Sequence, residues 1–168
     1  NKKGLTPLAV AGFNGNEDLL ELFIKGGADP NVEDNSRKTA ILYAAAKGFD
    51  RIVKRLLSIG IDVNRAYGND LTVLMWASGY SNDVPENDGV NTVKTVLGFG
   101  AKTDLQDNRG WTAMMTAANM GHSKIVEILV NAGADPHKKS KTGQTAAKLA
   151  QISGHSDIQK ALNLIGAK

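Results

Sequence analysis

The chain has 168 residues, of which 42% are hydrophobic and 22% charged, and it contains no cysteine. Its 20 Lys and Arg against 17 Asp and Glu give a formal net charge of +3, which is too mild to indicate the concentrated basic face of a nucleic-acid-binding protein. The sequence shows no apolar stretch long enough to cross a bilayer. We therefore expect no contact with a membrane, and the length predicts a single domain over residues 1–168, which we expect to be monomeric on its own.

A repeat with a period of 33 residues runs through the chain. Thr6, Thr39 and Thr72 are spaced at this period, as are Thr112 and Thr145, whereas 40 residues separate Thr72 from Thr112. The spacing defines five units: 1–33, 34–66, 67–106, 107–139 and 140–168. The third unit carries a seven-residue insertion, which we place in a loop over 80–90. A fixed period of this size is typical of stacked repeats, each of which buries its apolar face against its neighbours.

Each unit carries residues that typically begin and end two short helices. The repeated Thr predicts the N-cap of a first helix, and Pro7 suits the first turn because its missing N–H is not needed there. Gly15, and its equivalents at 48, 121 and 154, suit a left-handed residue at the end of that helix. A second helix follows, with its apolar face in unit two on Ile52, Val53, Leu56 and Leu57.

The residues within the units closely resemble those of the ankyrin repeat. Unit one reads Gly4-Leu5-Thr6-Pro7-Leu8-Ala9, followed by Gly15 and by Gly27-Ala28-Asp29-Pro30-Asn31, and the other units follow the same pattern over essentially the whole chain. The resemblance implies an all-α fold with short β-hairpin turns, a solenoid of five helix-turn-helix units. The chain departs from the family at the fourth place of the Thr-Pro-Leu-His segment, so the hydrogen bonds of that His must be replaced or lost. That place holds Ala9, Leu42, Met75, Met115 and Lys148.

The two ends of the array differ from its middle. Unit five has polar residues where the inner units are apolar, which predicts a C-terminal cap: Lys148, Gln151, Gln159 and Asn163. In unit one, Leu20, Phe23 and Ile24 have the character of interior residues. Either a preceding segment covers them, or the first helix pair leaves some apolar surface exposed.

The resemblance further implies that hairpin tips and first helices line a concave groove that binds protein partners. The residues expected there are Phe13, Lys38, Tyr43, Lys47, Leu71, Trp76, Tyr80, Arg109, Trp111, Met120 and Gln144. Trp, Tyr and Arg dominate binding hot spots. For Trp76, packing between first helices and contact with a partner both stay open, whereas Trp111, at the junction of hairpin and helix, favours contact. The basic residues among the aromatic ones indicate an acidic or mixed partner surface.

The insertion is the most individual part of the sequence. Between residues 80 and 90 it carries three acidic side chains, Asp83, Glu86 and Asp88, and no Lys or Arg. Their spacing lacks the alternating ligands and terminal Glu of a calcium loop, so we predict no metal site. The loop is either a surface elaboration or a second contact that grips the edge of the partner.

No catalytic or cofactor-binding pattern is found. His122 and His155 occupy the same repeat position and are expected to be framework residues, and no phosphate-binding glycine loop is present. We therefore expect a non-enzymatic module that binds a folded protein and inhibits or sequesters an enzyme, such as a bacterial inhibitor that protects its own cell. The alternatives are a reader of a short peptide or modified tail, with Trp76, Tyr80 and Trp111 as an aromatic cage, and an architectural scaffold.

Two further observations bear on the compartment. The chain starts at Asn1, which fits either removal of a leader or trimming, and it has no cysteine. Together they favour export, for instance to a periplasm, over the cytoplasm.

Overall fold

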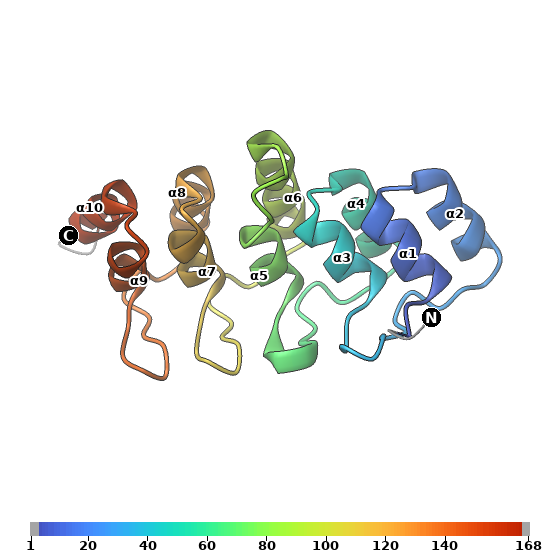
Figure 1. Ribbon diagram of the computed structural model, residues 1–168, viewed down its shortest axis with the longest axis horizontal. Helices are drawn as coiled ribbons and strands as arrows, with labels where there is room; N and C mark the ends of the chain where they lie inside the picture. The colour runs from blue at the N-terminus through green and yellow to red at the C-terminus, as the bar shows by residue number, and fades with distance from the viewer. Residues whose placement is uncertain (1–3, 166–168) are drawn as a thin grey trace.

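The computed structural model describes residues 4–165, which form a row of helix pairs with long turns between them (Figure 1). The first helices of the five pairs are α1 (Pro7–Asn14), α3 (Ala40–Ala46), α5 (Val73–Ser78), α7 (Ala113–Met120) and α9 (Ala146–Ile152). The second helices are α2 (Glu17–Lys25), α4 (Asp50–Ser58), α6 (Glu86–Gly98), α8 (Ser123–Asn131) and α10 (Ser156–Ile165). A short 3₁₀ turn, η1 (Gly68–Asp70), lies in the third unit. The fold-class prediction is confirmed: the described residues form a helical solenoid.

Helix boundaries follow the predicted capping residues. The hydroxyl of Thr6 accepts a hydrogen bond from the N–H of Ala9 at 3.0 Å, and the Thr72, Thr112 and Thr145 hydroxyls cap their helices in the same way. Thr39 is the exception, since its side chain makes no cap bond to α3. Gly15 ends α1 with φ at 70°, a left-handed conformation that a residue without Cβ adopts most readily.

Small residues let the first helices approach closely. An alanine that is completely buried recurs once per unit at the contact between adjacent first helices, at positions 11, 44, 77, 117 and 150. Adjacent first helices pack on one another along the row, and each second helix covers its own first helix. In unit two, Ile52, Val53 and Leu56 of α4 are at most 1% exposed. The predicted apolar face of the second helix is therefore the core face.

The expected hairpins contain no β-strand in the part of the chain that is described. The four turns before α3, α5, α7 and α9 are instead closed by a backbone bond across the base, as from the N–H of Asp107 to the carbonyl of Trp111 at 2.9 Å. Neighbouring turns are also joined, as by the bond from the N–H of Lys141 to the carbonyl of Arg109 at 2.9 Å. The turns thus form a connected layer below the helices (Figure 1).

One of the missing His bonds is replaced by sulfur. The Sδ atom of Met75 accepts a hydrogen bond from the backbone N–H of Thr72 at 3.4 Å, while the Thr72 hydroxyl accepts from the N–H of Met75. The two residues therefore form a reciprocal capping box at the start of α5. In this unit the methionine ties the turn to the helix.

The loop formed by the insertion is shorter than predicted. Residues 80–90 were expected to form a loop, but α6 begins at Glu86, so the last five of them are helical. Pro85 precedes the first turn with φ at −56°, and the carboxylates of Glu86 and Asp88 lie where the helix dipole favours negative charge. The insertion therefore lengthens α6 at its N-terminus, and α6 extends farther than its neighbours (Figure 1).

The two ends of the described chain differ in their exposure. In unit five, Lys148, Gln151 and Asn163 are exposed and Gln159 is half-buried, although Leu164 is 71% exposed as well. In unit one, Leu20 is buried, whereas Phe23 and Ile24 are half-buried. The single-domain assignment, the unit boundaries and the cap at 140–168 stay predictions. No helix between residues 4 and 165 is both long and apolar enough to cross a bilayer.

Candidate protein-binding surface

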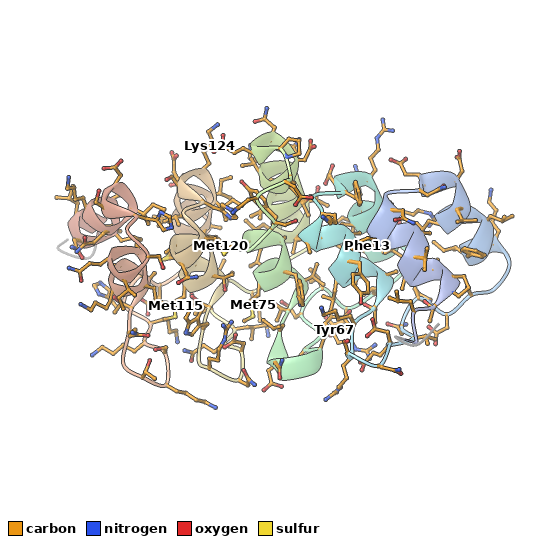
Figure 2. The ribbon with its side chains drawn as sticks, viewed as in Figure 1. Phe13, Tyr67, Met75, Met115, Met120 and Lys124 are labelled. Carbon is orange, nitrogen blue, oxygen red and sulfur yellow. The ribbon has the colours of Figure 1, made fainter. Side chains whose placement is uncertain are left out.

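The residues predicted to contact a partner fall mainly on one surface, which we call the first-helix face. It consists of the turn residues just before each capping Thr, the side chains of α1, α3, α5, α7 and α9 that do not pack between repeats, and Lys47 directly after α3. Phe13 is 47% exposed and Met120 is 36% exposed, and they lie at the ends of α1 and α7 (Figure 2). The structure gathers most of the other predicted residues into two groups on this face.

The first group, the Lys38 cluster, comprises Phe13, Lys38, Tyr43, Lys47 and Trp76. The Lys38 ammonium lies 4.7 Å from the centroid of the Trp76 ring and 5.6 Å from that of Tyr43. Phe13 meets Tyr43 edge-to-face with ring centroids 5.8 Å apart. These distances fall within the range of favourable cation–π and aromatic contacts, so three repeats share one aromatic surface with a cation on it.

The position of Tyr43 is fixed by a buried carboxylate. Its hydroxyl donates to Asp34, which also accepts from the backbone N–H groups of Ser36 and Lys38 at 2.7 and 3.0 Å. Burial opposes ionisation of Asp34, but these hydrogen bonds outweigh it and lower its pKa. Burial and the bond to Asp34 raise the pKa of Tyr43 to about 12. The carboxylate is thus anionic at neutral pH and holds the tyrosine in place as a neutral donor.

Lys47 links the aromatic surface to the insertion. Its ammonium lies 5.7 Å from the centroid of the Phe13 ring and 2.8 Å from the carboxylate of Asp83. The hydrogen bond from Lys47 lowers the pKa of Asp83 to about 2. Near this contact a hollow of about 370 Å³ opens between α3 and the insertion, lined by Phe13, Lys47 and Val84 among others.

The second group, the Arg109 cluster, comprises Leu71, Asp107, Arg109 and Trp111. The Arg109 guanidinium lies over the Trp111 ring, 4.2 Å from its centroid, and bonds the Asp107 carboxylate at 2.7 Å. That carboxylate is almost fully buried and also accepts from the backbone N–H of Trp111 at 2.9 Å. A hollow of about 380 Å³ between the third and fourth turns is lined by Leu71 and Arg109. A single buried acid therefore orients both the arginine and the tryptophan.

Trp76 combines the two roles that the sequence left open, packing against the core and exposure on the surface. Its side chain is half-buried and packs against the core, while one of its surfaces carries Lys38. Trp111 is likewise half-buried rather than free. Leu71, at the repeat position equivalent to Trp111, also packs against the core. Gln144, at the same position in the fifth unit, is half-buried. Packing and surface presentation are therefore combined in these side chains.

Tyr80 does not belong to the exposed part of this surface, which corrects the sequence-based assignment. It is 5% exposed and stacks on His122 at the start of α8, with ring centroids 3.9 Å apart and the planes 5° apart. The cage of Trp76, Tyr80 and Trp111 is thus not formed. In addition, Lys38 already lies over the Trp76 ring and Arg109 over the Trp111 ring.

The acidic residues of the insertion are also largely engaged within the chain. Asp83 bonds Lys47 in unit two, and Glu86 bonds Lys124 of α8 in unit four at 2.6 Å (Figure 2). Between them, Val84 is buried against Gly48, and the N–H of Ser81 bonds the carbonyl of Ala46 at 3.3 Å. Asp88 is exposed. The insertion is therefore a strap that ties units two, three and four together.

The sequence reading missed the buried acids at the turns. Asp34 and Asp107 stand five residues before Thr39 and Thr112, and both are among the few charged residues that are buried. The shared repeat position of Asp34 and Asp107 can be found in the sequence. Their contacts with Tyr43 and Trp111 depend on the conformation of the turns, so the sequence did not predict them. His122 and His155 are framework residues as predicted, bonding the carbonyls of Ser78 and Asn119 at 3.0 and 3.2 Å.

Comparison with known proteins agrees with the architecture. The family described as ankyrin repeats (3 copies) matches residues 7–86 and again 84–167. An ankyrin repeat and KH domain-containing protein of Caenorhabditis briggsae is 32% identical over 133 residues, which is 77% of this chain and 5% of that protein. A Rickettsia bellii protein named for its ankyrin repeats is 32% identical over 130 residues, which is 75% of this chain and 38% of that protein.

A relative of similar length is the Escherichia coli ankyrin repeat protein YahD, 29% identical over 193 aligned positions that cover 94% of each chain. The Caenorhabditis briggsae and Rickettsia bellii proteins are much longer, so the chain spans less than two fifths of the length of each of them. Proteins of this family generally mediate protein–protein interaction and are generally not enzymes. The repeat geometry and the matched residues together establish that the chain belongs to the ankyrin repeat family.

Proposed function

We propose that the first-helix face binds one folded protein partner, and that binding inhibits or sequesters that partner, an enzyme. The observation that carries the proposal is the repeated pairing of a cation with an aromatic ring on this face. Lys38 lies on Trp76, Lys47 on Phe13 and Arg109 on Trp111, so the pairs span four of the five units.

This arrangement suits the recognition of an acidic or mixed surface. Each cation is held in place before a partner arrives, by its ring and, for Lys47 and Arg109, by a carboxylate of the chain. Pre-organised side chains lose less conformational entropy on binding, and aromatic and arginine anchors contribute most of the energy in typical interfaces. A face built over four units has room for a standard interface of about 800 Å² per partner.

A folded partner is favoured over a modified peptide tail. A cation-reading cage needs free aromatic faces within about 6 Å of one ammonium. Tyr80 is buried, and the Trp76 and Trp111 rings carry Lys38 and Arg109. An inhibitor fits a broad surface of this kind, including the case of a bacterial protein that protects its own cell, and it requires no catalytic group.

The test compares the parent chain with a Phe13→Ala/Trp111→Ala variant as baits in the lysate of the source organism. A Lys54→Ala/Lys94→Ala variant, changed at exposed residues of α4 and α6, is the matched control. A protein captured by the parent and control, but lost with the aromatic variant, is then purified. Its affinity should fall about 30-fold or more for Trp111→Ala, which corresponds to a loss of about 2 kcal/mol.

The activity of the purified partner decides the finer proposal. Inhibition that saturates at one chain per enzyme supports the inhibitor role, whereas an unchanged activity contradicts it and leaves recruitment or scaffolding. Equal capture by the aromatic variant and the parent contradicts the assignment of the first-helix face.

A further inference from the structure

The outer helices at the two ends of the array form two equivalent grooves with different chemistry. One lies between α2 and α4, the other between α8 and α10. Counted from the glycine that precedes each second helix, Glu21 matches Glu127 and Arg55 matches Ala161. In the same way Arg51 matches Asp157. The side chains at equivalent positions of the two grooves can therefore be compared directly.

In the first groove, side chains of the chain itself fill the space between the helices. Arg55 of α4 bonds both carboxylate oxygens of Glu21 in α2, at 2.8 and 3.1 Å. Arg51 reaches Glu17 at 3.7 Å. The hollow that remains measures about 290 Å³. Two arginines thus line this groove and pair with Glu17 and Glu21 of α2.

In the second groove, neither arginine is present. Ala161 leaves an opening of about 470 Å³ between α8 and α10, lined by Val126, Val130, Ile158 and Ile165. Ile165 is 39% exposed, and the helices make little direct contact. Within residues 4–165, the carboxylates of Glu127 and Asp157 on the rim form no ion pair. Among the residues that the structure describes, the groove is thus apolar with an acidic rim, and no Lys or Arg lines it.

We propose that this groove is a second docking site, which takes an amphipathic helix of a protein partner and receives one of its arginines on Glu127. Val126 and Ile158 form the buried floor of the groove, so the apolar side of the helix covers Val130, Ala161 and Ile165. The guanidinium pairs with Glu127 as Arg55 pairs with Glu21. Charge complementarity identifies the occupant: two carboxylates on the rim attract a basic helix and repel phosphate groups of nucleic acids or anionic lipids. The site lies on the second helices and does not depend on the first-helix face.

The probe is a side-chain-stapled helical peptide of about 15 residues, long enough to hold a helix, with two Leu and one Arg on one face. Its partner peptide has Gln in place of the Arg. Both carry a fluorophore, and binding to the whole chain is followed by anisotropy. Amide chemical shifts of the chain identify the groove that is occupied.

Four proteins are compared: the parent, Glu127→Gln, Ala161→Arg and Asp18→Asn. The last variant, at an exposed acid of α2, makes the same change of charge as Glu127→Gln and controls for net charge. We expect Glu127→Gln to weaken binding of the Arg peptide by about fivefold or more. Ala161→Arg should weaken it by about tenfold or more, because its guanidinium fills the groove and pairs with Glu127 as Arg55 does with Glu21. Asp18→Asn should bind as the parent does, and shifts should centre on α8 and α10.

Several results would overturn the proposal. These are equal binding of the Arg and Gln peptides, equal binding by Ala161→Arg and the parent, absence of binding up to millimolar peptide, or shifts confined to the first-helix face or to the α2–α4 groove. Circular dichroism of each variant shows whether it is folded, and Ala161→Arg, at an exposed helix position, provides a second test if Glu127→Gln is destabilised.

Discussion

The ring of Tyr80 lies parallel to the ring of His122, with centroids 3.9 Å apart and an interplanar angle of 5°. This stack joins the first residue of the insertion to the residue that caps α8 in the next repeat. His122 in turn bonds the carbonyl of Ser78, at the end of α5, at 3.0 Å. The insertion is thus built into the packing between units three and four.

Removal of the Tyr80 ring should destabilise the array. Tyr80→Ala leaves a cavity beside His122 and should lower the free energy of unfolding by about 2–4 kcal/mol. Tyr80→Phe keeps the stacked ring and should cost less than about 1 kcal/mol. Urea unfolding followed by circular dichroism measures both, and a Tyr80→Ala protein as stable as Tyr80→Phe would show that the stack contributes little.

Two glycines of α6 should respond in opposite ways to alanine. A Cβ at Gly89 would come 2.3 Å from the Tyr80 ring, so Gly89→Ala must displace the ring and should cost about 1–3 kcal/mol. At Gly98 an added Cβ meets nothing within 4 Å, and Gly98→Ala should stabilise the helix by about 0.5–1 kcal/mol. Thermal unfolding of the pair checks the prediction, which is wrong if both variants shift in the same direction.

Arg37 occupies a backbone conformation that favours glycine. Its φ is 57°, and the equivalent turn position holds Gly4, Gly110 and Gly143 in other units, all with positive φ. Because a left-handed non-glycine residue is strained, Arg37→Gly should raise the free energy of unfolding by about 1 kcal/mol. The ion pair lost with Glu33 is exposed and offsets little of this gain.

The reverse change provides the control. Gly143→Ala, at a φ of 79° with open space around it, should destabilise the chain by about 1 kcal/mol. Chemical denaturation gives both values. A destabilised Arg37→Gly variant would mean that the arginine side chain matters more than the strain.

Stability should fall in mild acid through His122. Burial lowers the pKa of His122 in the folded state below its ordinary value, against an opposing bond to the Ser78 carbonyl. The unfolded chain therefore binds the proton more readily, so this contribution to stability is complete above the unfolded pKa of about 6.5 and is lost as the pH falls below it. Denaturation midpoints between pH 7.5 and pH 5 measure the loss.

A histidine on the surface makes the matched comparison. His122→Gln should flatten the fall in stability between pH 7.5 and pH 5, whereas His137→Gln, at the exposed fifth turn, should keep it. If both variants retain the full dependence of the parent, the titration of His122 does not control the stability in this range.

The sequence alone determined the repeat, the family and most of the helix boundaries, because these depend on local rules. The start of α6 is the exception. A capping Thr, a left-handed Gly and an apolar stripe act within one unit, and each recurs at a fixed spacing. The period and the residues between Thr6 and Asn31 were therefore enough to predict a solenoid, and the caps at Thr72, Thr112 and Thr145 lie where that pattern places them.

Only the tertiary structure decided how side chains from different units meet. Tyr80 has the sequence position of an exposed residue, yet it is buried because α6 gains a turn and brings Gly89 against its ring. Asp83 is paired by Lys47, which is 36 residues away. Trp76 receives Lys38 from the preceding unit. Such contacts depend on the distance between stacked units and on the path of an inserted segment, neither of which is encoded in the period of a single repeat.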